Sequence, residues 1–462
     1  MAVAHVTVIG GGLAGSEAAF QLAVRGVSVT LVEMRPSVPS PAHHTDLLAE
    51  LVCSNSMKAD SPGRASAAGM LKTELEALGS LVMRCARATA VPAGGALAVD
   101  RVAFSTAVTA AVSALPGVDV VREEATDMPP GMVIVAAGPL ASPALEPAIS
   151  DLVGVGRLSF FDAAAPIVDA DSIDMDVCFA ASRYDKGGGA DYLNCPFDRE
   201  PFDAFAAALV SAARVTMREF ETEELFAACQ PIEEVVRRGA DAVRFGAMKP
   251  VGLTDPRSGR RPWAVAQLRP ENAARTAYNL VGFQTNLTFP EQRRVFRMIP
   301  GLAGAEFLRY GVMHRNTFVD SPRLLTPDLA LRTEPRVRFA GQITGTEGYL
   351  EAAGSGLLAA LGAYAVLAGV PAPCLPAVTV LGALIGHATD PGTDPYQPMH
   401  VNFGILPPLE PGVPAKAARY EAFAARGLRA VESFVGDRDD LGFAQAREAL
   451  GVALPVGRTV VA

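Results

Sequence analysis

Apolar runs typical of buried strands alternate with a stretch of helical spacing early in the chain. Residues His5–Ile9 (HVTVI) and Val27–Val32 (VSVTLV) are apolar and β-branched, which favours strands. Between them, Ser16–Arg25 places its apolar residues at helical spacing, and Gly26 is a typical residue to end a helix. This order predicts a βαβ unit and hence a parallel sheet.

The same pattern returns much later, after a long interruption. Val133–Ala137 (VIVAA) predicts another buried strand, and Val337–Ala340 (VRFA) predicts a strand that leads into a long helix of small residues. Between them lie short strands, amphipathic helices and glycine-rich loops. We therefore expect an α/β fold with a split Rossmann-like domain (1–155 and 331–410), an α+β insertion domain (156–330) and a helical tail (411–462).

One segment, Tyr349–Val370, is apolar and long enough to span a bilayer. Glu351 lies inside it, Glu347 lies just before it, and no basic residues flank it. We expect a buried helix rather than a membrane span. The first residues contain no basic region typical of a signal peptide, so we expect a cytoplasmic protein.

Composition supports a packed globular protein but leaves the partner open. Of 462 residues, 50% are hydrophobic and 19% are charged, and the net charge of −9 argues mildly against a nucleic-acid partner. Residues 231–330 nevertheless carry 15 Lys and Arg against 9 Asp and Glu. This local excess is compatible either with RNA binding by one face or with a mixed solvated surface.

Cysteine and histidine spacing indicates neither a metal site nor a redox pair. Among 6 cysteines the closest two, Cys178 and Cys195, are 17 positions apart, so no CxxC pair exists. The 6 histidines show no HxH or HExxH spacing, and we predict no metal.

A glycine motif joins the first strand to the first helix. Gly10, Gly12 and Gly15 form GxGxxG, and Glu33 ends the next strand, where an acid can bind a ribose hydroxyl. The glycines allow a tight turn, a close approach to a pyrophosphate and close packing of helix on strand, while the helix N-terminus offers N–H groups to the phosphates. A glutamate at this place favours FAD or NAD over NADP. The cofactor-binding candidates here are Gly10, Gly11, Gly12, Leu13, Ala14, Gly15 and Glu33.

FAD is preferred over NAD because of the later strand and helix. Phe339–Glu351 (FAGQITGTEGYLE) places a strand end before a helix N-terminus, which in split FAD folds faces the flavin ring and stabilises charge on it. A plain turn between strand and helix has the same spacing. The segment adds Gly341, Gln342, Glu347, Gly348 and Tyr349 as cofactor-binding candidates.

Several longer sequence segments carry a specific resemblance to a known family. They are AHHTDLLAELVCSNSMK (42–58), FDAAAPIV (161–168), CQPIEE (229–234), FGAMKPVGL (245–253), YNLVGFQTN (278–286), RYGVMHRNTF (309–318) and QPMHVNFGILPP (397–408). With the glycine motif, they resemble the folate- and FAD-dependent tRNA (uracil-5-)-methyltransferases from about residue 3 to 410. The resemblance implies FAD as cofactor, 5,10-methylenetetrahydrofolate as one-carbon donor, NAD(P)H as reductant and a uridine in the T-loop of tRNA as target.

The implied chemistry needs a thiolate and a two-electron reductant. A thiolate added at uracil C6 makes C5 nucleophilic enough to attack an electrophilic carbon, and the transferred methylene must then be reduced to methyl. Cys229 precedes Pro231, which can begin a helix whose N-terminal dipole would stabilise a thiolate, and the resemblance places the RNA-attacking cysteine there. Glu233 and Glu234 oppose this unless they point away.

Cys53 is the second catalytic candidate. It lies among polar residues in LVCSNSMK, an unusual setting for a core cysteine. The resemblance places it beside the flavin, either as general base for deprotonation of C5 or as a protector of the flavin. The remaining thiols, Cys85, Cys178, Cys195 and Cys374, are expected to pack in the interior.

Other polar residues are weaker candidates. His43 or His44 could bind flavin or folate, or make only loop hydrogen bonds, and His314 with Arg315 and Asn316 could line the site. Lys249 and Arg244 could contact phosphate or the folate tail. A uridine in a folded loop must be flipped out to react.

Four alternatives stay open at this point. They are a ribosomal-RNA uridine target, the sister family that modifies wobble uridines, a plain FAD/NAD(P)H oxidoreductase without RNA, and a non-catalytic flavoprotein. The segment that begins at Cys229 (CQPIEE) favours the methyltransferases over the sister family. The presence of Cys53 and Cys229 argues against a non-catalytic protein. Oligomeric state is not determined by any of these patterns.

Overall fold

The structure is a computed structural model. It describes residues 4–40, 42–60, 65–154, 158–185, 190–215, 230–270, 275–393, 396, 398–410, 412–413 and 415–451, with 158–164, 185, 312–317 and 416 described by their backbone alone.

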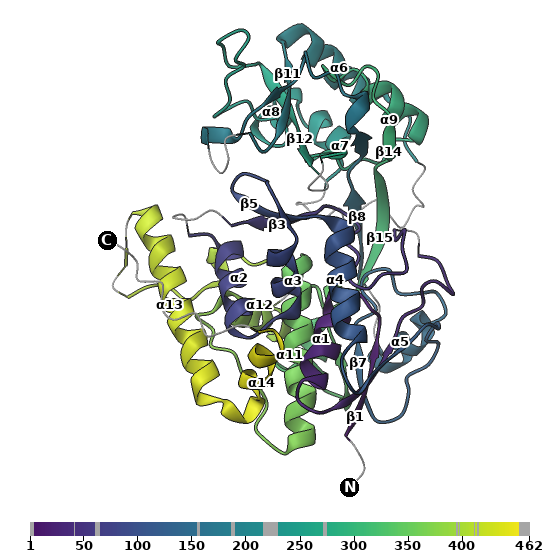
Figure 1. Ribbon diagram of the computed structural model, residues 1–462, viewed down its shortest axis with the longest axis vertical. Helices are drawn as coiled ribbons and strands as arrows, with labels where there is room; N and C mark the ends of the chain where they lie inside the picture. The colour runs from purple at the N-terminus through teal and green to yellow at the C-terminus, as the bar shows by residue number, and fades with distance from the viewer. Residues whose placement is uncertain are drawn as a thin grey trace.

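A six-stranded sheet forms the centre of the larger domain (Figure 1). Its strand order is β16-β17-β7-β1-β2-β6, and β1 runs parallel to both β2 and β7, as expected from the opening βαβ pattern. The late strand β17 returns to pair in parallel with β7, so the expected split of the domain in sequence is confirmed. The strands are β1 (His5–Ile9), β2 (Ser28–Val32), β6 (Val118–Val121), β7 (Met132–Val135), β16 (Ala330–Leu331) and β17 (Glu334–Phe339).

Two helices from distant parts of the chain pack together on this sheet. They are α1 (Leu13–Ala23) and α11 (Tyr349–Ala368). A Cβ at Gly356 would collide with the carbonyl of Ala14, so the small residues of α11 are needed for this close contact. By length and composition α11 could cross a membrane, yet 78% of its apolar stretch is buried inside the protein. Its apolar character is therefore accounted for by the core, as expected.

Further helices and a small antiparallel sheet surround the central sheet. The small sheet has the order β3-β5-β4. These elements are β3 (Ser56–Ala59), α2 (Ala67–Ala77), α3 (Leu81–Ala88), β4 (Ala90–Val91), β5 (Ala96–Val99), α4 (Arg101–Ser113), α5 (Glu146–Val153), α10 (Ser321–Leu324) and α12 (Val380–Thr389).

The insertion builds a second sheet with its own core. The strand order is β10-β11-β12-β13-β9-β14, and the phenylalanines Phe205, Phe283 and Phe296 pack beneath it. An antiparallel pair of strands, β8 (Leu158–Ala164) and β15 (Val312–Phe318), links it to the larger domain (Figure 1). The other elements are β9 (Ile167–Asp169), β10 (Phe179–Ala180), β11 (Leu193–Phe197), α6 (Arg199–Ser211), α7 (Ile232–Arg237), α8 (Ala240–Phe245), β12 (Ala264–Pro270), β13 (Ala277–Leu280), α9 (Phe289–Phe296) and β14 (Phe307–Arg309).

The C-terminal segment is helical, as its composition predicts. Helices α13 (Lys416–Asp437) and α14 (Phe443–Ala449) pack on the larger domain, and α13 lies against α2. A Cβ at Gly427 would collide with the Met70 side chain, which shows how close the two helices are.

Candidate active site

The glycine-rich turn lies at the carboxyl end of β1. Gly10 has φ 103°, a conformation that favours glycine, and a Cβ there would collide with the carbonyl of Ala136. A Cβ on Gly15 would overlap the carbonyl oxygen of Gly10, whereas a Cβ on Gly12 would meet no atom within 4 Å. The packing of the turn therefore requires Gly10 and Gly15, while the space in front of Gly12 is left for a ligand.

A large cavity opens in front of this turn. Its walls are the turn, the carboxyl ends of β2 and β7, and the start of α11. Neither α1 nor α11 has a side-chain cap, so their first N–H groups can serve a phosphate or another acceptor. The candidates that line this cavity are Gly10, Gly11, Gly12, Leu13, Ala14, Glu33, Gly341, Gln342, Gly348 and Tyr349.

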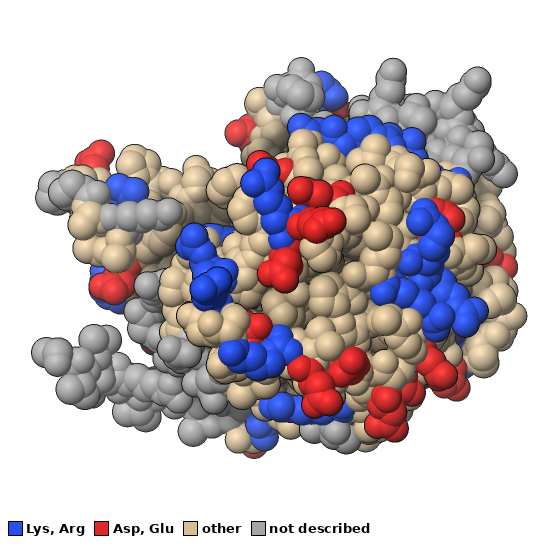
Figure 2. Space-filling model, turned by 90° about the horizontal axis from the view of Figure 1, so that it is seen from above, with Lys and Arg blue, Asp and Glu red and all other residues tan. Residues whose placement is uncertain are grey.

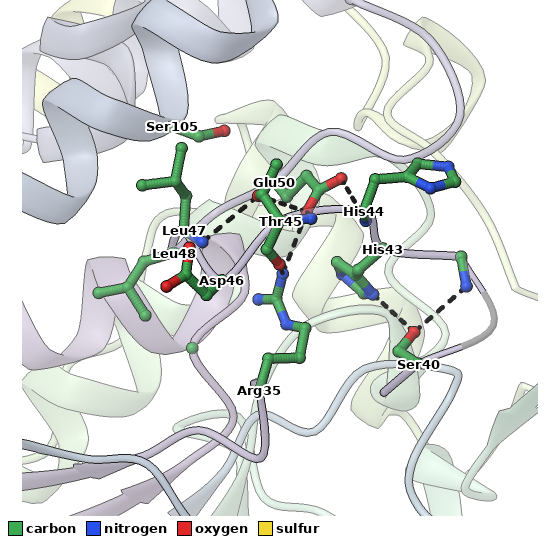
Figure 3. Close-up of polar contacts among 12 residues, drawn as sticks. Arg35, Ser40, His43, His44, Thr45, Asp46, Leu47, Leu48, Glu50 and Ser105 are labelled. Atoms are coloured by element: carbon green, nitrogen blue, oxygen red, sulfur yellow. Dashed lines mark hydrogen bonds and ion pairs between the residues drawn. The ribbon is translucent and has the colours of Figure 1, made fainter. Parts of the chain in front are cut away.

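The carboxylate of Glu33 is held by its neighbours at the edge of this cavity. Its Oε2 accepts the N–H of Gly11 at 2.8 Å, and its Oε1 accepts from Arg35 Nε at 2.8 Å. Burial alone would raise the pKa of Glu33, but the hydrogen bonds and charge of Arg35 outweigh it and lower the pKa. Arg35 in turn donates to Thr45 O and Glu50 Oε2, which fixes the loop after β2 (Figure 3). Glu33 is thus an ionised, preorganised acceptor.

His43 lies on the same loop and lines the cavity. Its Nδ1 lies 2.7 Å from Ser40 Oγ (Figure 3). Burial, and then the nearby Arg35 cation, lower the pKa of His43 to about 4, so the ring is neutral at neutral pH. His44 is exposed and lines neither cavity of the site. Of the two histidines, the structure therefore brings only His43 to the cofactor side.

A second cavity adjoins the first and contains Cys53. The two cavities share Gln342, Gly348 and Tyr349 in their walls. Glu347 lines the second cavity and accepts from Gln342 Nε2 at 2.9 Å. Cys53 is partly exposed, so its thiol is accessible from this space. Cys53 thus lines the second cavity, and its backbone N–H is held by Tyr349, which lines both cavities.

The loop that carries Cys53 is held from four elements. The backbone N–H of Cys53 donates to Tyr349 Oη at 2.9 Å. Its carbonyl accepts from Arg101 at 3.2 Å and from Arg309 at 3.0 Å. Arg269, from the insertion, donates to Asn55 Oδ1 of the same loop at 2.8 Å. Both domains therefore fix the position of Cys53, which sequence spacing does not reveal.

Three residues at the second cavity were missed as site residues by the sequence reasoning. Lys58 has φ 65°, and its Nζ lies 2.6 Å from Glu351 Oε1, whose side chain is only 1% exposed. His400 lines the same space, and burial together with the Lys58 ammonium lowers its pKa. Lys58 and His400 lie in the family-like segments AHHTDLLAELVCSNSMK and QPMHVNFGILPP. Their place in these segments was the signal in the sequence that could have identified them as site residues.

The nucleophile candidate Cys229 lies outside the described residues. Helix α7 does begin at Ile232, directly after Pro231, as expected. The oxygens of Glu233 accept from Asn286 N at 2.7 Å and from Thr285 Oγ1 at 2.9 Å.

Glu234 pairs with two arginines, Arg214 and Arg237. Glu233 and Glu234, whose charges would disfavour a thiolate before α7, therefore both form hydrogen bonds or ion pairs with other residues.

The remaining polar candidates are not brought to the two cavities. The side chains of His314, Arg315 and Asn316 lie outside the described part of the chain, although their backbone forms part of β15. Lys249 is exposed, and Arg244 covers the ring of Trp263 at 3.6 Å while pairing with Asp241.

The excess of basic residues in 231–330 does not form one basic face. Seen from the end that carries the insertion, Lys and Arg lie in separate groups among Asp and Glu (Figure 2). Arg237, Arg244, Arg257 and Arg294 each pair with an acid within three positions. These four arginines are therefore paired locally, while the net positive excess of the range remains.

The expectation for the other cysteines is confirmed with one exception. Cys85, Cys178 and Cys195 are buried, and the sulfurs of Cys178 and Cys195 lie 3.4 Å apart. Cys374 is exposed, contrary to expectation. It lies between α11 and α12 in the proline-rich stretch PAPCLP, which can extend neither helix and runs over the surface. Among the described residues no group of three or more His, Cys, Asp or Glu could hold a metal, and the absence of a metal stays a prediction.

The parallel sheet, the glycine turn and the cavity at its carboxyl edge define a dinucleotide-binding protein of the split Rossmann class. A model of the family described as glucose inhibited division protein A matches residues 5–371. A solved structure of Aquifex aeolicus GidA has a TM-score of 0.70 at 16% identity, covering 97% of this chain and 78% of that one. This likeness supports the FAD-binding Rossmann-type fold.

Closer relatives are found among curated proteins. The chain is 55% identical over 432 residues to the methylenetetrahydrofolate--tRNA-(uracil-5-)-methyltransferase TrmFO of Pelobacter propionicus, covering 93% of this chain and 94% of the relative. Identity to the protein of the same name from Geobacter sulfurreducens is 54% over 431 residues, with 93% and 98% covered. The chain therefore belongs to the glucose inhibited division protein A family and, within it, to the methylenetetrahydrofolate--tRNA-(uracil-5-)-methyltransferases.

Proposed function

We propose that this protein methylates C5 of a uridine in the T-loop of tRNA. The one-carbon donor is 5,10-methylenetetrahydrofolate, FAD is the redox cofactor, and NAD(P)H is the reductant. The observation that carries the proposal is the position of Cys53 in a second cavity that shares Gln342, Gly348 and Tyr349 with the cofactor cavity. Family membership supports the same reaction.

The residues of the first cavity fit FAD. The uncapped start of α1 and the free space in front of Gly12 suit a pyrophosphate, and the ionised Glu33 suits a ribose hydroxyl. Gly341 and Gly348, with φ of 84° and 119°, form the turn before α11 and line this cavity, where they would hold a flavin ring. When bound, FAD supplies the electron pair that converts a transferred methylene to methyl.

The protein residues supply activation and positioning. Cys229 is the proposed nucleophile at uracil C6, carried over from the sequence. Cys53 either removes the C5 proton or protects the cofactor, and its fixed carbonyl and N–H limit where the thiol can lie. The second cavity, with Lys58, Glu351 and His400, is the space we assign to the one-carbon donor and the target base.

The domain organisation supports separate roles for the two domains, with FAD binding in one and RNA contact in the other. We place the FAD-binding domain at 1–155 and 331–410, because the parallel sheet takes its strands only from these ranges, apart from Ala330 at one edge. We assign RNA contacts to the insertion domain, 156–330. The tail, 411–462, supports the FAD-binding domain through α13 and α2. The cytoplasmic location stays a prediction.

The test is a methyl-transfer assay with purified protein, unmodified tRNA transcript, labelled 5,10-methylenetetrahydrofolate and NADPH. Label is expected at C5 of a T-loop uridine, and a ribosomal RNA fragment serves as the competing substrate. Cys229→Ala should retain FAD and transfer no label. Transfer to ribosomal RNA alone, or a protein that takes up no flavin, would overturn the proposal.

A further inference from the structure

A column of aromatic rings runs from the core of the insertion domain to its surface. Phe307 packs on the core ring of Phe296, with centroids 6.4 Å apart. Tyr310 stacks on Phe307 at 5.4 Å and 20°, and Phe289 stacks on Tyr310 at 4.9 Å and 16°. The outermost ring is therefore held in a fixed plane by rings that are anchored in the core.

That outermost ring is half exposed. Phe289 is 50% exposed, and Tyr310 is its one ring partner among the described residues. A planar aromatic surface, fixed from behind and open in front, is the arrangement on which unpaired bases stack in RNA-binding proteins. A folding role accounts for the inner rings, and the stacking on Tyr310 fixes the plane of the exposed Phe289 ring.

An arginine with no partner among the described residues lies on the same helix face. Arg293 is four positions after Phe289 in α9, so the two side chains are neighbours on the helix surface. Arg293 is exposed and makes no hydrogen bond or ion pair with any described residue. Its neighbours are engaged, since Arg294 pairs with Glu291 and Arg297 donates to Ala305 O. Arg293 is thus available to a phosphate.

The column adjoins the loop that carries Cys53. Tyr310 directly follows Arg309, whose guanidinium donates to the carbonyls of Val52 and Cys53 at 3.0 Å each. The segment that carries Tyr310 is therefore joined to the Cys53 loop through Arg309.

We propose that Phe289 and Arg293 form a contact site for unpaired RNA, in which a base stacks on the Phe289 ring and Arg293 pairs with an adjacent phosphate. This site rests on the proposed function and assigns to it a place where the substrate loop is held. It binds nucleotides that flank the reacting uridine and takes no part in the chemistry.

The test compares tRNA binding and turnover in matched variants of the full-length flavin-loaded protein. Phe289→Ala is expected to raise the Kd for unmodified tRNA transcript roughly tenfold and to raise KM with kcat little changed. Phe289→Trp should restore binding, because it keeps a stacking surface. Arg293→Ala should weaken binding and reduce the slope of log Kd against log salt by about 0.7, the value for one phosphate contact on a single strand. Phe289→Ala should leave that slope unchanged.

Controls come from exposed residues on the larger domain. Val366→Ala removes an exposed apolar side chain at the far end of α11, and Arg429→Ala removes an exposed arginine on α13. Both should bind tRNA like the parent protein. Equal tRNA affinity for the parent and Phe289→Ala, in a parent that transfers methyl normally, would overturn this contact site while leaving the proposed function intact. A parent dimer that Phe289→Ala converts to monomer would also overturn it, since the ring would then serve contact between copies of this chain.

Discussion

The hydroxyl of Tyr349 accepts the backbone N–H of Cys53 at 2.9 Å, across 296 positions of sequence. It also accepts the N–H of Ser54 at 3.0 Å. Tyr349 is the first residue of α11 and lines both cavities. One side chain thus sets the distance between the thiol loop and the helix N-terminus at the cofactor cavity.

Tyr349→Phe is expected to slow methyl transfer roughly tenfold. Two backbone N–H groups lose their hydrogen-bond acceptor, so the Cys53 loop is no longer held against α11. The ring remains, so flavin content, read from the visible absorbance, should stay near that of the parent. Single-turnover transfer rates give the measurement. An unchanged rate would show that the contacts from Arg101, Arg269 and Arg309 position the loop without Tyr349.

Arg309→Ala should reduce kcat by about tenfold or more, since the guanidinium joins the carbonyls of Val52 and Cys53 to that of Ala165, which directly follows the linking strand β8. Arg309→Lys should recover only part of this loss, because an ammonium lacks the planar fork that reaches these carbonyls together. Steady-state assays that separate kcat from KM for tRNA make the distinction. A change confined to KM would indicate an RNA contact rather than loop positioning.

Two glycines of the same motif should respond differently to a methyl group. Gly15→Ala introduces a Cβ onto the carbonyl oxygen of Gly10, so the flavin-free protein should lose about 2 kcal/mol or more of stability. Gly12→Ala adds its Cβ to open space and should leave the flavin-free protein nearly as stable, while lowering FAD affinity at least tenfold. Thermal unfolding of the flavin-free proteins and flavin titration separate the effects. Unaltered FAD binding by Gly12→Ala would place the pyrophosphate elsewhere.

The pH dependence of stability should include a contribution from His43. Burial and the Arg35 cation lower its pKa to about 4, whereas the unfolded chain has a pKa near 6.5. Between about pH 4 and pH 6.5, His43 is protonated in the unfolded state but neutral in the folded state. The contribution of His43 to the free energy of unfolding is therefore complete above about pH 6.5 and is lost as the pH falls toward 4.

The measurement compares the parent with His43→Gln, which cannot titrate. From pH 7 to pH 4.5 the parent should lose roughly 2 kcal/mol of unfolding free energy more than this variant does. Denaturant midpoints at several pH values provide the comparison, and NMR titration of labelled histidines reads the pKa directly. A His43 signal that titrates near pH 6.5 would contradict the buried, neutral ring.

Much of the scaffold could be predicted from local pattern. The sequence predicts the strand Val27–Val32, the turn at Gly10 and the later strand Val337–Ala340. Buried parallel strands are short apolar runs, and tight turns need glycine. The exposed Cys374 was mistaken for a core residue, because a free cysteine carries no signal of its depth when prolines flank it.

By itself, the sequence determined the split Rossmann class, the dinucleotide turn and the candidate thiols, since these depend on residues close together in the chain. Only the tertiary structure decided that Tyr349, Arg101 and Arg309 converge on the Cys53 loop, that Lys58 meets Glu351, and that Phe289 ends a column of rings. Those contacts join elements tens to hundreds of residues apart. They form when sheet, helix and insertion pack against one another, and no local pattern of apolar and polar residues encodes which distant side chains will then meet.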